Sequence, residues 1–318
     1  MIAKKRKNNF FLPTRFFTKK ERVFEIDFLR GFDIFLMILV HATFTLGFGA
    51  TIVFTWPNGM PLWINKGIDF FRFIFVAITQ PAGSASNAFL MHTIGYSATT
   101  NLFALEAFFA GLFMFLCGIS CTFSKSNLSR GMKLAYVSAL MTIGLEFISF
   151  LIPPFNFHIY WGILQSMSAA LLIYTLFDHF FPKWYHDLIF IIPLIIINAC
   201  FLWFSYSQGQ MDTIKVTEAS TFSEFSLNCL GLFFGKFRDG NDYFPPLLVT
   251  LVLFLGAIVG KTLYKDKKSL LRDDFPKAWS KPILFIGKHT LIIYLSHQII
   301  LFIILGIVFL PLGAAFNE

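Results

Sequence analysis

Charged residues are scarce in this sequence of 318 residues, because Asp, Glu, Lys and Arg make up only 14% of it. A soluble domain usually contains about 25% charged residues. Hydrophobic residues, in contrast, make up 56% of the chain, and the mean hydropathy is +0.67. The composition therefore excludes an ordinary soluble protein and leaves little of the chain for a separate soluble domain.

Cysteine is also rare, and its spacing is not that of a metal site. Of the four cysteines, only Cys117 and Cys121 lie close together, and both fall inside an apolar run. Free cysteine is among the residues that are most often buried. We therefore expect inert packing thiols and no bound metal.

A signal-peptide cleavage site and internal repeats are missing as well. The first 22 residues are basic and polar, and no small-residue motif follows the first apolar run, so that run should remain as a helix. No segment recurs at a fixed period, and no pair of interrupted helices occupies matching halves. The lack of a repeat and the lack of paired interrupted helices weaken the case for a transporter built from inverted repeats.

Seven apolar runs are long enough to cross a membrane, since a spanning helix needs about 20 apolar residues. They lie at residues 31–52, 102–123, 134–152, 159–177, 188–206, 246–264 and 282–310. A backbone exposed to lipid must satisfy its own hydrogen bonds, so these runs predict helices. We expect an all-α fold, a polytopic membrane bundle of about seven to eight transmembrane helices. A basic segment at 1–23 would precede a single domain at 24–310 and a short tail at 311–318.

An eighth apolar stretch, 63–79, is rich in Phe but carries Lys66, Asp69 and Arg72. Charged side chains at this spacing favour a helix that lies at the membrane surface or re-enters it. A full crossing by this stretch is left open.

The basic residues indicate the orientation. They gather before the first run, at 125–133 and at 265–281, and seven crossings place all three segments on one side. Positively charged loops stay in the cytoplasm, so the N-terminus should be cytoplasmic and the loop 207–245 outside. Anionic lipid headgroups explain the net charge of +8 without a nucleic-acid partner.

The first apolar run carries polar residues along one face. In FEIDFLRGFDIFLMILVH, residues Asp27, Arg30 and His41 fall within about 60° of one another, with His41 about 16 to 21 Å deeper. One explanation is an ion pair at the headgroups and a packed core histidine. The other is a functional site, because a buried neutral imidazole accepts protons near neutral pH.

Other polar residues at membrane depth are spread along the chain. GKHTLIIYLSHQ in the last run contains Lys288, His289, His297 and Gln298. Glu106, Gln165 and Asp242 lie in or beside three earlier runs, and each is a candidate for function or for simple hydrogen bonding. Gly118, Gly256 and Gly260 predict close helix packing.

The order of several motifs resembles one known family. IDFLRG, LMILVH, FLCGIS, SRGMKL, GILQ, DYFPP, LGAIVG and GKHTLIIYLSHQ follow one another as in bacterial membrane proteins related to heparan-α-glucosaminide N-acetyltransferase. The similar segment covers about residues 24–301. The resemblance implies a membrane acyltransferase that moves an acetyl group from cytosolic acetyl-CoA to a sugar amine or hydroxyl at the outer face.

The resemblance also suggests roles for residues. His41, Asp27, His297 and Asp242 match motif positions expected in the catalytic centre, and Gln165 and Gln298 match positions beside the acceptor, where we also place Glu106. The basic residues of the cytoplasmic rim suit the phosphates of acetyl-CoA: Arg30, Arg130, Lys133 and Lys288.

A second class of function fits some of the same residues. A secondary transporter or flippase would use His41, Glu106 and His297 as a proton relay. The expected partners of the acyltransferase are acetyl-CoA, a carbohydrate or glycolipid acceptor, and membrane lipids, in a bacterial cytoplasmic membrane. The sequence leaves a homodimer open.

Overall fold

The computed structural model describes residues 23–79, 105–151, 159, 161–207, 212–213, 221–234, 237–238, 243–266, 268–271 and 278–316. Helices dominate these ranges, and the strands there are two residues long. β1 (Phe54–Thr55) pairs antiparallel with β4 (Ala315–Phe316), and β2 (Asp212–Thr213) pairs parallel with β3 (Phe237–Arg238). The predicted all-α fold is confirmed.

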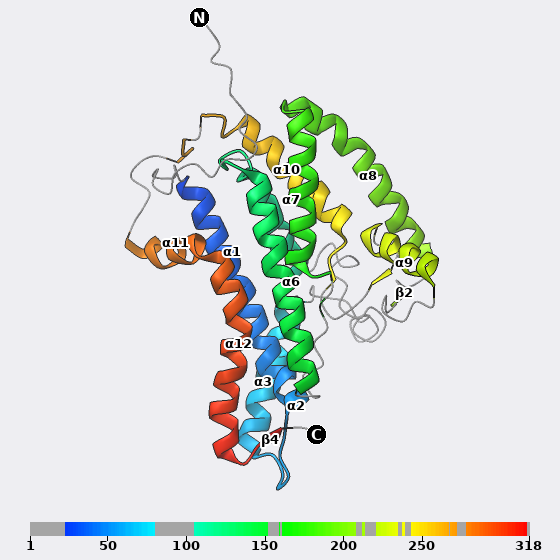
Figure 1. Cartoon of the computed structure of the whole chain (residues 1–318). Coiled ribbons are helices and arrows are strands. Elements are labelled where there is room, and N and C mark those ends of the chain that lie inside the picture. Colours follow the sequence, from blue (N-terminus) through cyan, green and yellow to red (C-terminus); the bar gives the residue numbers. More distant parts are fainter. Residues whose placement is uncertain are drawn as a thin grey trace, which may run out of the picture.

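The helices follow one another in an order that can be traced by colour in Figure 1. The α-helices are α1 (Phe24–Phe44), α2 (Ala50–Val53), α3 (Leu62–Thr79), α5 (Leu105–Ile119), α6 (Asn127–Leu151), α7 (Ile163–Phe180), α8 (Trp184–Ser207), α9 (Phe222–Phe234), α10 (Pro246–Thr262), α11 (Lys281–Lys288) and α12 (Thr290–Phe309). A π-helical turn, η1 (Thr45–Gly49), joins α1 to α2. Short 3₁₀ turns, η3 (Ala278–Ser280) and η4 (Leu310–Leu312), flank α11 and α12.

Several helices have the length and composition of membrane spans. Phe24–Gly49, Asn127–Leu151 and Thr290–Leu312 are long and apolar enough to cross, and shorter apolar helices occupy Phe108–Ile119, Trp184–Cys200, Phe222–Phe234 and Pro246–Thr262. Large apolar side chains face outward on them, such as Phe150 and Ile307, which are 81% and 68% exposed. On helices of this length and composition, such surfaces are stable against lipid. The chain is an integral membrane protein.

The last predicted span is two helices. The run 282–310 breaks at His289, whose backbone (φ −117°, ψ 25°) is not helical, so α11 ends there and α12 begins one residue later. Figure 1 shows α11 lying across α1, while α12 runs alongside α1. Hydropathy alone missed the break because both pieces are apolar.

A second correction concerns the loop predicted at 207–245. Its residues Phe222–Phe234 form α9, an apolar helix of 13 residues. This helix is shorter than the 20 or so residues that a crossing requires. Stretch 63–79 forms the continuous helix α3, which packs on α1 and η1.

Glycines allow two close helix crossings. At Gly118 on α5 and Gly256 on α10, an added Cβ would overlap the backbone of the opposite helix, and Gly260 is close to Ile119 in the same way. This confirms the packing role predicted for these three glycines. Gly31 and Gly287 make an equivalent crossing between α1 and α11. The second crossing positions the start of the last helix pair against the first helix.

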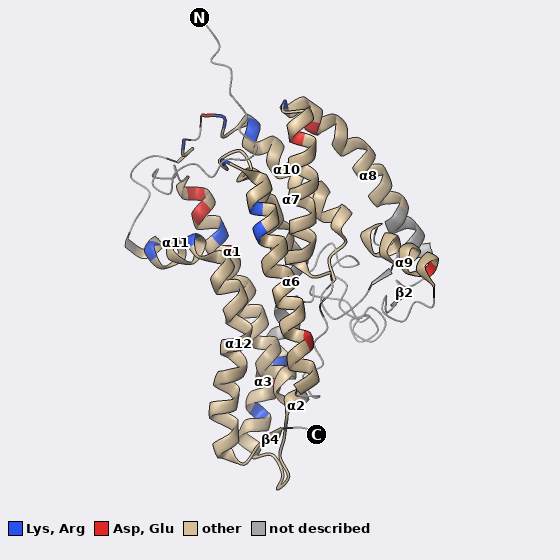
Figure 2. Ribbon diagram, in the orientation of Figure 1, with Lys and Arg blue, Asp and Glu red and all other residues tan. Residues whose placement is uncertain are grey.

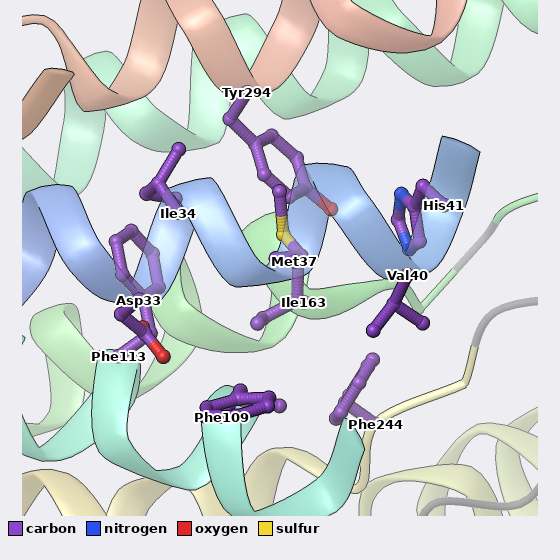
Figure 3. A pocket seen from close by; sticks show the side chains of 11 residues that line it. Asp33, Ile34, Met37, Val40, His41, Phe109, Phe113, Ile163, Phe244 and Tyr294 are labelled. Carbon is purple, nitrogen blue, oxygen red and sulfur yellow. The ribbon is translucent and has the colours of Figure 1, made fainter. Parts of the chain in front are cut away.

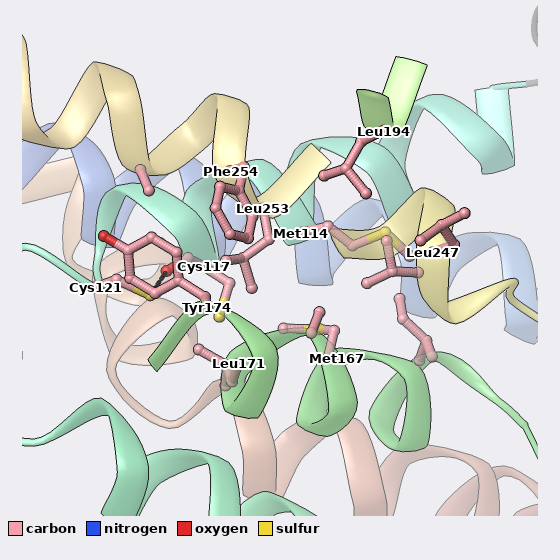
Figure 4. Packing of buried hydrophobic residues seen from close by; sticks show 14 of the residues in the cluster. Met114, Cys117, Cys121, Met167, Leu171, Tyr174, Leu194, Leu247, Leu253 and Phe254 are labelled. Carbon is pink, nitrogen blue, oxygen red and sulfur yellow. Dashed lines mark hydrogen bonds between the residues drawn. The ribbon is translucent and has the colours of Figure 1, made fainter. Parts of the chain in front are cut away.

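The main apolar core lies between α5, α7, α8 and α10. Figure 4 shows Met114, Met167 and Leu194 in one buried cluster with Phe254. The ring of Phe254 meets that of Tyr174 edge-on, with ring centroids 5.2 Å apart. Cys117 and Cys121 are free and buried in this core, as predicted for packing thiols, whereas Cys200 is exposed and Cys229 is partly exposed, contrary to the prediction. The core packs against one face of α5, and another face of this helix lines the site next to α1.

Charged residues gather at one end of the bundle. Figure 2 shows the Lys and Arg residues of α6, α10 and α11 near the end where α1 begins. At the same end Lys261 Nζ lies 2.6 Å from Asp178 Oδ1 and 2.7 Å from Asp187 Oδ2, which ties α10 to α7 and α8. Glu25 accepts hydrogen bonds from Ser269 Oγ and Leu270 N, so the segment after α10 is fastened to α1.

Candidate functional site

Two cavities follow each other along α1. The first is a polar cleft at the charged end of the bundle, with about 710 Å³ of empty space that is partly open to solvent. Its wall consists of residues from α1, α5, α6 and α11 and their ends: Val23, Ile26, Asp27, Arg30, Ser120, Phe123, Arg130, Gly287, Lys288 and Thr290. Three of the four predicted donor-binding cations therefore meet in one place.

Arg30 and Arg130 are held by the segment that ends α5. Arg30 Nη2 donates to the carbonyl of Leu116 (3.2 Å), and Arg130 Nη1 donates to the carbonyl of Ser120 (3.2 Å). Arg30 Nη1 also lies 3.9 Å from Asp27 Oδ1. A guanidinium has five N–H donors, so these contacts leave both side chains able to bind an anion in the cleft.

Lys133 is separate from these residues. It lies one turn beyond Arg130 on α6, its side chain is exposed, and it does not line the cleft. Of the four basic residues predicted to bind the donor, three therefore line the cleft and one lies outside it. The sequence could not separate them, because Arg130 and Lys133 are neighbours on one helix face.

The second cavity is a narrow apolar pocket that begins one helical turn beyond Arg30, with about 540 Å³ of empty space, part of which is open to solvent. It is lined by Asp33, Ile34, Met37, Val40, His41, Phe109, Ala110, Phe113, Ile163, Phe244 and Tyr294. Figure 3 shows Asp33 beside Phe113 at one end and His41 beside Val40 at the other. A ligand in this pocket would reach from the level of the cleft to the imidazole.

His41 and His297 form a direct pair across α1 and α12. Nδ1 of His41 lies 2.7 Å from Nε2 of His297, and the rings stack with centroids 5.0 Å apart. His297 Nδ1 lies 2.5 Å from the carbonyl oxygen of Tyr294, which only accepts, so this nitrogen carries the proton. With both rings neutral, His297 Nε2 accepts from His41 Nδ1–H. The lone pair of His41 is then on Nε2, in a residue that lines the pocket.

A second contact, between α12 and η1, lies one turn beyond His41. Gln298 Nε2 donates to Thr45 Oγ1 (3.0 Å), and its Oε1 is buried without a partner among the described residues. Thr45 begins the π-helical turn, in which the ordinary helical hydrogen bonds are shifted. Arg72 from α3 donates from Nε to the carbonyl of Gly47 (2.7 Å) and stabilises this turn.

Asp33 is a residue of the pocket wall that was not predicted from the sequence. Its side chain is 2% exposed, and its Oδ1 has no hydrogen-bond partner in the part of the chain that the structure describes. An acidic residue within an apolar run was the available indication, in the same stretch as Asp27, Arg30 and His41.

Phe244 forms the wall of the pocket opposite α1. Its amide donates to the carbonyl of Trp161 (2.9 Å), and its own carbonyl accepts from Ser166 Oγ (2.5 Å). The preceding Tyr243 donates its hydroxyl proton to the carbonyl of Leu232 on α9. Burial raises the pKa of Tyr243, so this donor keeps its proton. These bonds explain the DYFPP motif, although Asp242 itself lies outside the described residues.

The remaining predicted residues lie outside the two cavity walls or cannot be placed. Gln165 on α7 donates to Thr142 Oγ1 (2.8 Å) and does not line the pocket, although its Oε1 is buried without a partner among the described residues. The side chain of Glu106 lies outside the described part of α5. Among the described residues, no group of three or more His, Cys, Asp or Glu is arranged to hold a metal ion.

The fold and the site define an all-α membrane protein in which a cationic cleft is followed along α1 by a separate apolar pocket, lined by one member of a histidine pair. The family model of the heparan-alpha-glucosaminide N-acetyltransferase catalytic domain matches residues 85–299. This is more than half of the chain, and the protein belongs to that family of membrane acetyltransferases. The matched range includes His297 and Gln298, while α1 precedes it. Comparisons with curated proteins and with solved structures found no match.

Proposed function

We propose that the protein transfers an acetyl group from cytosolic acetyl-CoA to a sugar amine or hydroxyl that reaches His41 from the other side of the membrane. One observation carries the proposal: a cationic cleft and a pocket that ends at a histidine pair follow each other along α1. The family membership supports acetyl transfer as the reaction.

The polar cleft suits the nucleotide end of the donor. Acetyl-CoA carries several phosphate charges, and Arg30, Arg130 and Lys288 line one cavity that is partly open to solvent. Guanidinium groups bind phosphate oxygens through pairs of parallel hydrogen bonds, and a lysine adds a point charge. Asp27 would orient Arg30, since its Oδ1 lies 3.9 Å from Arg30 Nη1. Its role would be to position this guanidinium and not to contact the phosphates.

The apolar pocket suits the rest of the donor. Arg30 and His41 are eleven residues apart on one helix, a rise of about 16 Å. The pantetheine arm of CoA is long, thin and uncharged, so it can enter a narrow apolar pocket that phosphates cannot. The thioester would then lie beside the imidazole of His41 and away from bulk water.

His41 acts as the general base in this proposal. Its Nε2 takes the proton from the acceptor's hydroxyl or amine as the acceptor oxygen or nitrogen attacks the thioester carbonyl. The C–S bond breaks, and the sulfur of CoA leaves as a thiolate that takes the proton back from His41 Nε2. His41 Nδ1–H still donates to His297 Nε2 when the imidazole is charged, so the pair stabilises the protonated state.

Purified protein in lipid nanodiscs tests the proposal, with radiolabelled acetyl-CoA and extracts of bacterial glycans or glycolipids as acceptors. His41→Ala should lower acetyl transfer by about 100-fold or more, the usual contribution of a positioned base, and leave CoA binding unchanged. His289→Ala is the matched control, because His289 is exposed and lies outside both cavities. Full activity of the His41 variant would remove His41 from the reaction, and absence of CoA binding to the unmodified protein would overturn the acetyltransferase proposal.

A further inference from the structure

Asp33 is an unusual group in the wall of the apolar pocket. Its side chain is almost completely buried, and its Oδ1 has no hydrogen-bond partner among the described residues. The pocket around it is otherwise formed by apolar and aromatic side chains, with His41 at the far end. Figure 3 places Asp33 at the end of the pocket, with Phe113 next to it.

A buried carboxyl oxygen without a partner is costly for the folded protein. Burying a polar group without a hydrogen bond costs about 1 to 3 kcal/mol in proteins, and more when the group is charged. Nearly all buried polar groups are therefore paired. An aliphatic residue at position 33 would avoid this cost, so the oxygen is best explained by a partner that a ligand supplies.

The position of Asp33 indicates which ligand group that is. It lies one turn past Arg30, about 4 to 5 Å further along the helix, and about 12 Å before His41. In the donor path proposed above, the phosphates stay in the cleft and the acetyl group reaches His41. The segment that passes Asp33 is then the pantetheine arm, whose two amide N–H groups and one hydroxyl are hydrogen-bond donors.

We propose that Asp33 is a donor-binding residue whose Oδ1 accepts a hydrogen bond from an N–H or O–H group of the pantetheine arm. This inference rests on the proposed function and adds a selectivity element to it. The carboxyl group would bind the uncharged arm and repel phosphates, so that the nucleotide cannot slide from the cleft into the pocket. Cleft and pocket would then fix the donor in one register, with its thioester at His41.

Equilibrium binding to the full-length protein in nanodiscs tests this, with CoA and adenosine 3′,5′-bisphosphate as probes. The second probe has the nucleotide's phosphates but no pantetheine arm. Asp33→Leu should weaken CoA binding about 10- to 100-fold, the effect of losing a hydrogen bond to a charged or strongly polar group. Binding of the bisphosphate should remain unchanged. Asp33→Asn keeps an acceptor oxygen at the same place and should weaken CoA binding less.

Each other outcome contradicts the inference in a distinct way. Equal CoA affinity in the unmodified and Asp33→Leu proteins would remove Asp33 from the donor site. If that variant instead bound CoA normally but required a higher concentration of acceptor for half-maximal rate, Asp33 would belong to the acceptor site. Loss of both probes in a variant with unchanged thermal unfolding would place Asp33 at the nucleotide. If the unmodified protein binds the bisphosphate but not CoA, the donor proposal itself fails.

Discussion

At the scale of single residues, the site depends on a contact between two histidines that are far apart in the sequence. His41 and His297 were both predicted as site residues, each from its own apolar run. The structure joins them through a hydrogen bond of 2.7 Å. A single sequence gives the helix face of each residue, but it does not give the crossing of α1 and α12 that brings the faces together.

The pairing changes what mutations should do. We expect His297→Ala to lower turnover by about 10- to 100-fold, because His41 Nδ1–H loses the partner that keeps its free lone pair on Nε2. Groups that act as one unit have non-additive effects, so the His41→Ala, His297→Ala double variant should be no slower than His41→Ala. His297→Gln retains an acceptor oxygen and should recover part of the rate. Multiplicative losses in the double variant would show two independent roles.

The cleft separates Lys133 from the other three basic residues that were predicted to bind the donor. We expect Arg30→Ala to weaken CoA binding by about 1.5 to 3 kcal/mol, the contribution of a hydrogen bond to a charged group. Lys133→Ala is the matched control, because Lys133 is exposed and outside the cleft. Isothermal titration of CoA compares the two variants, and equal losses in both would mean that general surface charge, and not the cleft, attracts the donor.

At the scale of secondary-structure elements, most helices could be predicted but their breaks could not. Runs of apolar residues gave the helices α1, α5, α6, α7, α8 and α10 with shifts at their ends. The break at His289 follows instead from the close crossing of α11 over α1, where Gly287 meets the backbone of Asp27. Such a crossing is a tertiary contact, and hydropathy does not contain it.

This crossing gives a prediction about Gly287. A Cβ at this position would overlap the carbonyl of Asp27, so Gly287→Ala should displace α11 or lower stability by several kcal/mol. Because Lys288 is the next residue, CoA binding should weaken as well. Gly144→Ala on α6 is the control, since no atom lies near its added Cβ, and alanine there should be neutral or stabilising. Thermal unfolding in detergent measures the stability of both variants. An unchanged midpoint for Gly287→Ala would contradict the tight crossing.

At the scale of the whole molecule, the sequence predicts that the basic segments lie on one side of the membrane. The positions of the basic residues on the helices are consistent with this prediction. Figure 2 shows the basic residues of α6, α10 and α11 at the end where α1 begins, which is also the end that holds the polar cleft. A donor from the cytoplasm requires this end to face the cytoplasm. The orientation therefore links the membrane topology to the proposed function.

The orientation can be tested with two exposed positions. Seven crossings place Lys183, between α7 and α8, in the cytoplasm, and Asn58, before α3, outside. In a variant without the four native cysteines, Asn58→Cys should react with a membrane-impermeant maleimide in intact cells, whereas Lys183→Cys should react only after the membrane is opened. The reverse pattern would place the cationic cleft outside, where acetyl-CoA does not occur. Labelling of both positions in intact cells would mean that the helices between them cross an even number of times, so the stretch 63–79 would have to be counted as a crossing.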